Sequence, residues 1–162
     1  MPVKYLNFAI HSASIFWLEI VMPSYSRFCK EQNRYNAIQA AWPAWHIIDW
    51  LWHEKHPHQD TRNNKEYMDF IKAHIDSCQQ LGWLRDITDA TKHCGLGRSN
   101  LVVKDTAGTG LHTEGQIFSE YGNQPITQRD PLKIILDNGT SHDFPEVLGA
   151  AIEYWRKIIS FP

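Results

Sequence analysis

The sequence predicts a mainly α protein, a bundle of four to five helices with a small antiparallel β insertion before the C-terminal helix. Apolar residues recur at helical spacing through most of residues 3–94 and again near the C-terminus. Between them, at about 100–140, glycines and β-forming residues replace that period. Residues 40–53 hold four of the seven tryptophans, and a helix that is apolar on nearly every side is normally buried. Trp45 and Trp52 are therefore expected in the core.

At 162 residues the chain is expected to form one domain, 1–162, with the insertion at about 99–143. A net charge of −2 offers no basic excess for non-specific binding to a phosphate backbone. The three cysteines are an odd number without a CxxC pair, which predicts a reducing, cytoplasmic compartment. Polar residues interrupt the apolar N-terminal patch, so neither a signal peptide nor a membrane span is expected.

The first half of the chain is expected to form two helical runs. The first covers residues 3–22, and Pro23 ends or kinks it. The second starts near Ser24 and continues through the tryptophan-rich residues 40–53. Because no turn signal precedes Pro43, we expect one long helix that is kinked at this proline.

Three more helices and a short β segment are expected after the loop at residues 56–64. Residues 65–81 and 83–94 form two of the helices, separated by Gly82. The last helix covers residues 145–160 and returns to the bundle to bury Trp155. Candidate strands occupy the intervening segment, and a hairpin turn is predicted at Asn138-Gly139; the strands are 101–104, 115–121, 132–136 and 141–143.

A polar stripe lies on the tryptophan-rich helix. His46, Asp49 and His53 have the spacing i, i+3, i+7, which places them within about 60° of one another on an α-helix. A buried polar stripe needs partners, because an unpaired buried carboxylate is costly. Such partners are expected on another helix.

A second stripe with the same spacing is formed by Asp86, Asp89 and His93. We expect the two helices to pack directly against each other with their stripes facing. The sequence thus predicts a buried His/Asp polar site between two helices and assigns it no activity, so whether the protein is an enzyme is left open.

Two interpretations of this site follow from the residues alone. In the first, the stripes form a structural network in which His46 and Asp49 pair with Arg85, Lys92 or His93. In the second, facing helices bind a divalent metal ion as cofactor, as bundles do with His and carboxylate ligands. The candidate metal ligands are His46, Asp49, His53, Asp89 and His93.

A third interpretation comes from a resemblance. The segment AAWPAWHIIDWLWHE, followed about thirty residues later by LRDITDATKHCGL, resembles uncharacterised bacterial helical-bundle proteins with an AWHxxDWxW helix and a KHxxL helix. The resemblance covers roughly residues 25–100. In outline these proteins are similar to the HEPN superfamily, helical bundles that often act as ribonucleases in toxin–antitoxin and phage-defence systems.

The HEPN resemblance implies a ribonuclease or nucleic-acid-binding protein with RNA as its partner and a site formed between two protomers of a homodimer. The HEPN signature is an Arg followed by four to six residues and a His, whereas seven residues separate Arg85 from His93 here. The resemblance implies that His93 is the general acid or base and that Arg85 or Lys92 stabilises the transition state. Asp49 completes this candidate catalytic set.

Overall fold

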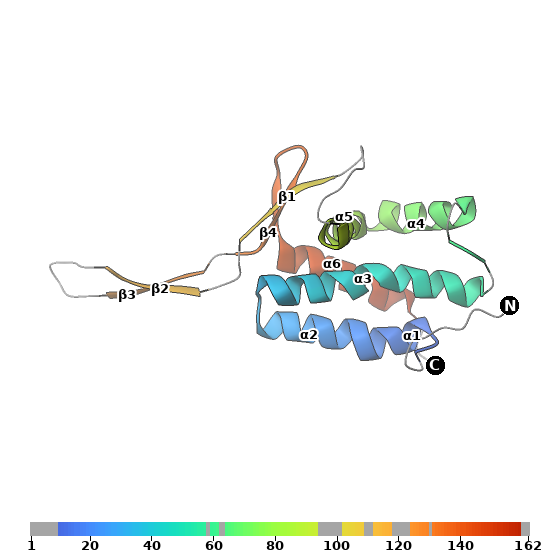
Figure 1. The fold of residues 1–162 in the computed structure, drawn as a ribbon, viewed down its shortest axis with the longest axis horizontal. Helices are drawn as coiled ribbons and strands as arrows, with labels where there is room; N and C mark the ends of the chain where they lie inside the picture. The colour runs from blue at the N-terminus through green and yellow to red at the C-terminus, as the bar shows by residue number, and fades with distance from the viewer. Residues whose placement is uncertain are drawn as a thin grey trace.

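The computed structural model describes residues 10–57, 59–61, 64–93, 102–108, 112–117, 124–129 and 131–159. As predicted, a helical bundle carries a small antiparallel β insertion before its last helix (Figure 1). The helices are α1 (Ala13–Phe16), the π-helix η1 (Trp17–Val21), α2 (Met22–Lys30), α3 (Arg34–Lys55), α4 (Lys65–Ser77), α5 (Gln79–His93) and α6 (Phe144–Ile158). The strands are β1 (Val103–Ala107), β2 (His112–Ile117), β3 (Gln124–Arg129), β4 (Lys133–Leu136) and β5 (Ser141–Asp143).

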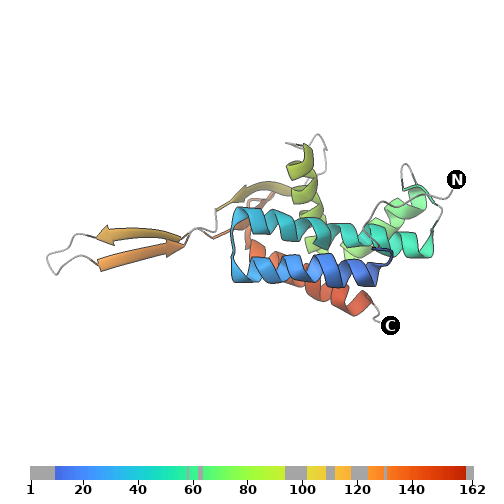
Figure 2. The ribbon, with the colours of Figure 1, turned by 60° about the horizontal axis from the view of Figure 1, so that its bottom comes forward.

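Helix α3 is the centre of the bundle, because it packs against each of the other helices that the structure describes. The α1–η1–α2 rod lies along one side of it, and α4 and α5 lie on the other (Figures 1 and 2). The prediction for the tryptophans is confirmed, since Trp45 is 5% and Trp52 is 2% exposed. Trp42, by contrast, is 47% exposed, so this helix is not buried on every side.

The first rod runs through Pro23 without ending. The N–H of Met22 bonds to the carbonyl of Trp17, five residues back, and Pro23 then sits in the first turn of α2. A proline lacks an N–H donor, and that lack is harmless in a first helical turn. The π-helix before Pro23 locally interrupts the regular hydrogen-bond pattern of the α-helix.

The expectation of one helical run from Ser24 into the tryptophan segment is wrong, although α3 does contain Pro43 as predicted. The chain turns between α2 and α3, where Asn33 accepts a hydrogen bond from the N–H of Asn36 at 2.8 Å. The side-chain amide of Asn36 donates in turn to the carbonyl of Glu31 at 2.8 Å. An asparagine N-cap thus starts a new helix where the apolar period alone predicted continuity.

The boundary between α4 and α5 also differs from the prediction, because it falls at Cys78 rather than at Gly82. Cys78 has an extended backbone and caps α4. Gly82 lies within α5, where a Cβ atom would come within 3.3 Å of the Cγ2 of Ile75 on α4. The glycine therefore allows two helices to approach closely and does not separate them.

Helix α6 returns to the bundle as predicted. Trp155 is fully buried, and its indole N–H donates to the carbonyl of Ala44 on α3 at 2.7 Å. Phe144 at the start of α6 packs edge-on against Phe28 of α2, with 5.3 Å between ring centroids. The last helix thus closes the core against both α2 and α3.

The β insertion contains a three-stranded antiparallel sheet in the order β1-β4-β5 and a separate β2-β3 pair. The predicted turn is confirmed: Gly139 has φ of 83°, and the N–H of Leu136 bonds to the carbonyl of Thr140 at 2.9 Å. Strand β3 was not predicted. Ala107, the last residue of β1, pairs with Lys133, the first residue of β4. The part of the chain that contains the β2-β3 pair therefore leaves and rejoins the sheet at neighbouring positions. Figure 1 shows this pair apart from the helices.

Candidate functional site

The helices that carry the two predicted stripes, α3 and α5, pack directly against each other, as expected. Four residues of α5 that lie outside its stripe share a hollow with α3. Ile87, Thr88, Thr91 and Lys92 line a hollow against α3. At about 100° per residue, Thr88 and Thr91 lie about 140 to 160° around α5 from Asp86. Asp86 therefore lies on the side of α5 away from this hollow.

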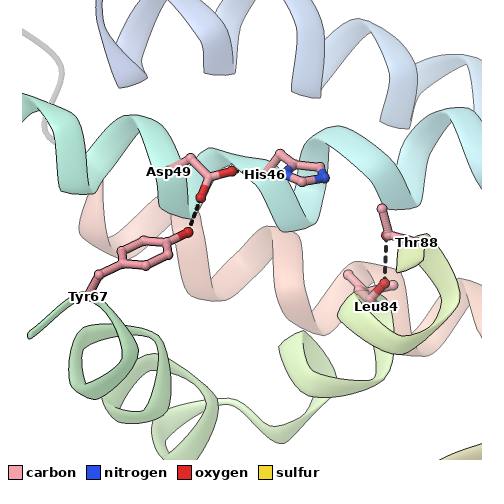
Figure 3. Close-up of polar contacts among 5 residues, drawn as sticks. All are labelled: His46, Asp49, Tyr67, Leu84 and Thr88. Carbon is pink, nitrogen blue, oxygen red and sulfur yellow. Dashed lines mark hydrogen bonds and ion pairs between the residues drawn. The ribbon is translucent and has the colours of Figure 1, made fainter. Parts of the chain in front are cut away.

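The middle residue of the stripe on α3, Asp49, contacts α4. The Nδ1 atom of His46 lies 2.8 Å from the Oδ2 atom of Asp49, one helical turn further on. The hydroxyl of Tyr67, in the first turn of α4, donates to the other carboxylate oxygen of Asp49. Figure 3 shows Asp49 between these two side chains, with Thr88 further along on α5. His46, Asp49 and Tyr67 form one cluster, which we call the His–Asp–Tyr cluster.

The Tyr67 hydroxyl keeps its proton. Its burial, followed by the negative charge of Asp49 and the hydrogen bond to that carboxylate, raises its pKa well above the ordinary value. A protonated phenol must donate to a carboxylate, and an ionised carboxylate is only an acceptor. The neighbouring Nδ1 of His46 must then carry a hydrogen as well. Its Nε2 atom, on the opposite edge of the ring, is directed away from Asp49.

The cluster is open to solvent on one side. The side chains of His46 and Asp49 are 26% and 34% exposed. The imidazole ring also lies against the exposed indole of Trp42, with 4.7 Å between ring centroids. A carboxylate-oriented histidine that solvent can reach has the arrangement of a general acid or base.

Asp86 has a structural role instead. Its side chain is 1% exposed, and its Oδ2 accepts the backbone N–H groups of Val102 at 3.0 Å and Val103 at 3.3 Å. It therefore holds the start of β1 against α5. The Nε of Arg85 lies 3.8 Å from the same carboxylate, and its guanidinium is 6.0 Å from the Trp45 ring centroid.

The remaining predicted residues occupy separate positions. Asp89 is half-buried on α5, and His93, the last residue of that helix, is exposed. His53 is half-buried on α3, one turn beyond Asp49. Within the described part of the chain, no group of three or more His, Cys, Asp or Glu side chains is arranged to hold a metal ion. The metal set and the Arg85–His93 pair remain predictions from sequence.

Two residues of the site were not predicted from sequence. Tyr67 lies in the helix after the loop, and its first-turn position gave no signal that its hydroxyl meets Asp49. Trp42 precedes His46 by four residues, a spacing that places two side chains side by side on a helix. That second signal was available in the sequence.

Comparison of the chain with protein-family models, with curated proteins and with solved structures returns no match. The resemblance to AWHxxDWxW proteins and to HEPN therefore remains a prediction. Among the helices of the described residues, none is both long enough and apolar enough to cross a membrane.

Proposed function

We propose that the protein is an acid–base catalyst in which His46 transfers a proton and Asp49 orients its ring. The observation that carries this proposal is the shared carboxylate, which accepts from His46 Nδ1 at 2.8 Å and from the Tyr67 hydroxyl. The tyrosine fixes the carboxylate, and the carboxylate fixes the tautomer and orientation of the imidazole. Nε2 is then the nitrogen that exchanges a proton with a substrate.

RNA is the substrate class that we propose, because the HEPN-like resemblance implies it; the proposal takes only the substrate from that resemblance and assigns the proton transfer to His46 in place of His93. In this reaction a ribose 2′-hydroxyl gives its proton to Nε2 of His46, and the 2′-oxygen bonds to the adjacent phosphorus. The bond from phosphorus to the 5′-oxygen breaks, and that oxygen takes a proton from water. His46 lowers the barrier for the first proton transfer, an effect typically worth about 100-fold or more.

The test is cleavage of a single-stranded RNA by wild type, His46→Ala and His93→Ala, with a DNA strand of the same sequence as substrate control. We expect cleavage of RNA alone, a loss of about 100-fold or more in His46→Ala, and a rate close to wild type in His93→Ala. A loss confined to His93→Ala would assign catalysis to the HEPN-like Arg85–His93 pair instead. No cleavage by the folded wild type would refute the RNA proposal.

Tyr67 and Asp49 are tested as positioning residues. Tyr67→Phe removes the hydroxyl that donates to Asp49, and Asp49→Asn removes the charge that His46 faces. We expect both variants to lower kcat with little change in KM, because they keep His46 but release its ring from the orientation that proton transfer needs. A rise in KM with an unchanged kcat would contradict this role.

A further inference from the structure

A groove runs along the N-terminal half of α3, bordered by the C-terminal half of α5 and by β1. It consists of two hollows, of about 250 Å³ and about 270 Å³, that share Ile38, Ile87 and Thr91. We call it the α3–α5 groove; its other lining residues are Arg34, Ala37, Ala41, Trp42, Thr88, Lys92, Thr106, Ala107, Gly108, Leu132 and Phe144. From Arg34 to Trp42 it spans nine residues of α3, or eight steps of the helix, about 12 Å at the rise of an α-helix.

One rim of the groove is an exposed apolar row. Tyr35, Ile38 and Trp42 are 64%, 38% and 47% exposed, and their spacing of i, i+3, i+7 puts them on one side of α3. Large apolar side chains that are grouped in this way on a surface typically mark an interaction site. The row continues directly into His46, which lies against Trp42.

The charges of the groove have one sign. Arg34 lines one hollow and Lys92 lines the other, and no carboxylate lines either hollow among the residues that the structure describes. Arg34 is held in place, since its Nε donates to the carbonyl of Gly108 at 3.1 Å. Gly108 itself has φ of +87°, and a Cβ there would lie 1.8 Å from the carbonyl oxygen of Pro131. The groove thus has an uncharged, mainly apolar floor with one cation lining each of its two hollows.

We propose that the α3–α5 groove binds an amphipathic helical segment of an acidic partner protein. Apolar side chains at i, i+3, i+4 and i+7 of about two helical turns would enter the floor, in the helix-in-groove mode of recognition. Carboxylates at both ends of that segment would meet Arg34 and Lys92. This binding site shares Trp42 with the proposed catalytic site, but neither proposal requires the other.

The charges favour this occupant over two others. A second copy of the chain would bring its own Arg34 and Lys92 to the same contact, and like charges across an interface are unfavourable. A nucleic-acid strand presents one phosphate per nucleotide, whereas the groove offers two cations on a chain of net charge −2. A helical segment with an apolar face and carboxylates at its ends would complement both the apolar floor and the two cations of the groove.

The experiment measures binding of a labelled synthetic peptide by fluorescence anisotropy. The probe is a helical peptide of about four turns, with leucines at i, i+3, i+4 and i+7 and glutamates at both ends; a second probe carries lysines in place of the glutamates. We expect the acidic probe to bind, Trp42→Ser to weaken its binding by about tenfold or more, and Lys92→Glu to reduce its preference over the lysine probe, because one cation then remains.

Matched controls lie elsewhere on the surface. Leu18→Ser removes an apolar side chain that is 56% exposed on η1, and Lys72→Glu reverses an exposed charge on α4; neither variant should change binding. Equal binding of both probes, or no binding of the acidic probe, would overturn the proposal. Two further results would also overturn the proposal. One is a dimer, detected by sedimentation, that Trp42→Ser abolishes. The other is binding of a single-stranded RNA oligonucleotide to the His46→Ala variant that is lost when Trp42→Ser is added.

Discussion

The indole N–H of Trp155 donates to the backbone carbonyl of Ala44 at 2.7 Å and so ties the last helix to the middle of α3. The two residues are 111 positions apart in the chain. Trp52, which is similarly buried, has an indole N–H with no hydrogen-bond acceptor among the described residues. The two tryptophans therefore form a natural comparison.

Replacing each tryptophan with phenylalanine separates the hydrogen bond from the packing. Trp155→Phe loses both aromatic volume and a buried hydrogen bond, whereas Trp52→Phe loses volume together with a donor that had no partner. We expect Trp155→Phe to lower the free energy of unfolding by about 1 kcal/mol more than Trp52→Phe does. Urea unfolding monitored by far-ultraviolet circular dichroism measures both values, and equal losses would contradict the role given to this hydrogen bond.

Asp86→Ala should detach the start of β1 from α5. The substitution leaves two backbone N–H groups without their acceptor, so we expect a loss of about 2–4 kcal/mol in the free energy of unfolding. Hydrogen exchange at the Val103 amide should accelerate at the same time. Asp105→Ala is the control, because Asp105 is exposed and, among the described residues, its carboxylate bonds to the N–H of its neighbour Thr106. A small stability loss with unchanged exchange would show that Asp86 does not hold the strand.

Asp49→Asn should change stability little. His46 and Asp49 are 26% and 34% exposed, and an ion pair in such a position is worth at most about 1 kcal/mol. The measurement is urea unfolding at pH 7, with and without a chelator. A loss above about 3 kcal/mol in both conditions would support the structural-network interpretation. Stability that falls on chelation in wild type, but not in the variant, would support the metal interpretation.

Acid should destabilise the fold partly through His74. Burial, and then the positive charge of Lys55, lower the pKa of this imidazole, which also lies 2.7 Å from the Tyr154 hydroxyl. The unfolded chain therefore takes up the proton at a higher pH than the folded chain, so stability falls as pH drops below about 6.5. His74→Gln should reduce this slope by at most about 1.4 kcal/mol per pH unit; an unchanged slope between pH 8 and pH 5 would contradict the assignment.

The spacing of the apolar residues and the residue types in the turns were sufficient to predict a helical bundle with a β insertion. The helical spacing of apolar residues predicted the bundle, and Asn138-Gly139 predicted the β4-β5 hairpin, because each signal acts within a few residues. The break at Asn33 was missed because an N-cap can start a helix inside an apolar run. Strand β3 was missed because its sequence, QPITQR, is polar and contains a proline.

The site was harder to predict, because spacing on one helix does not tell which way that helix is turned. His46 and Asp49 do meet each other, as their separation of three residues allows. Asp86, the first residue of the stripe on α5, accepts hydrogen bonds from the start of β1 instead. The contact between Asp49 and Tyr67 depends on how α4 packs, which no local pattern determines.

The pairing of Ala107 with Lys133 also matters for protein engineering. The chain between these residues leaves and re-enters the sheet at adjacent positions, so its two ends are already joined by the β1-β4 ladder. A short turn could replace the β2-β3 pair, whose end residues His112 and Arg129 are paired with each other, or a foreign domain could be inserted there, provided that the core residue Leu132 is kept. The β2-β3 pair is thus a modular graft point, at which a tag or sensor could be carried without opening the core.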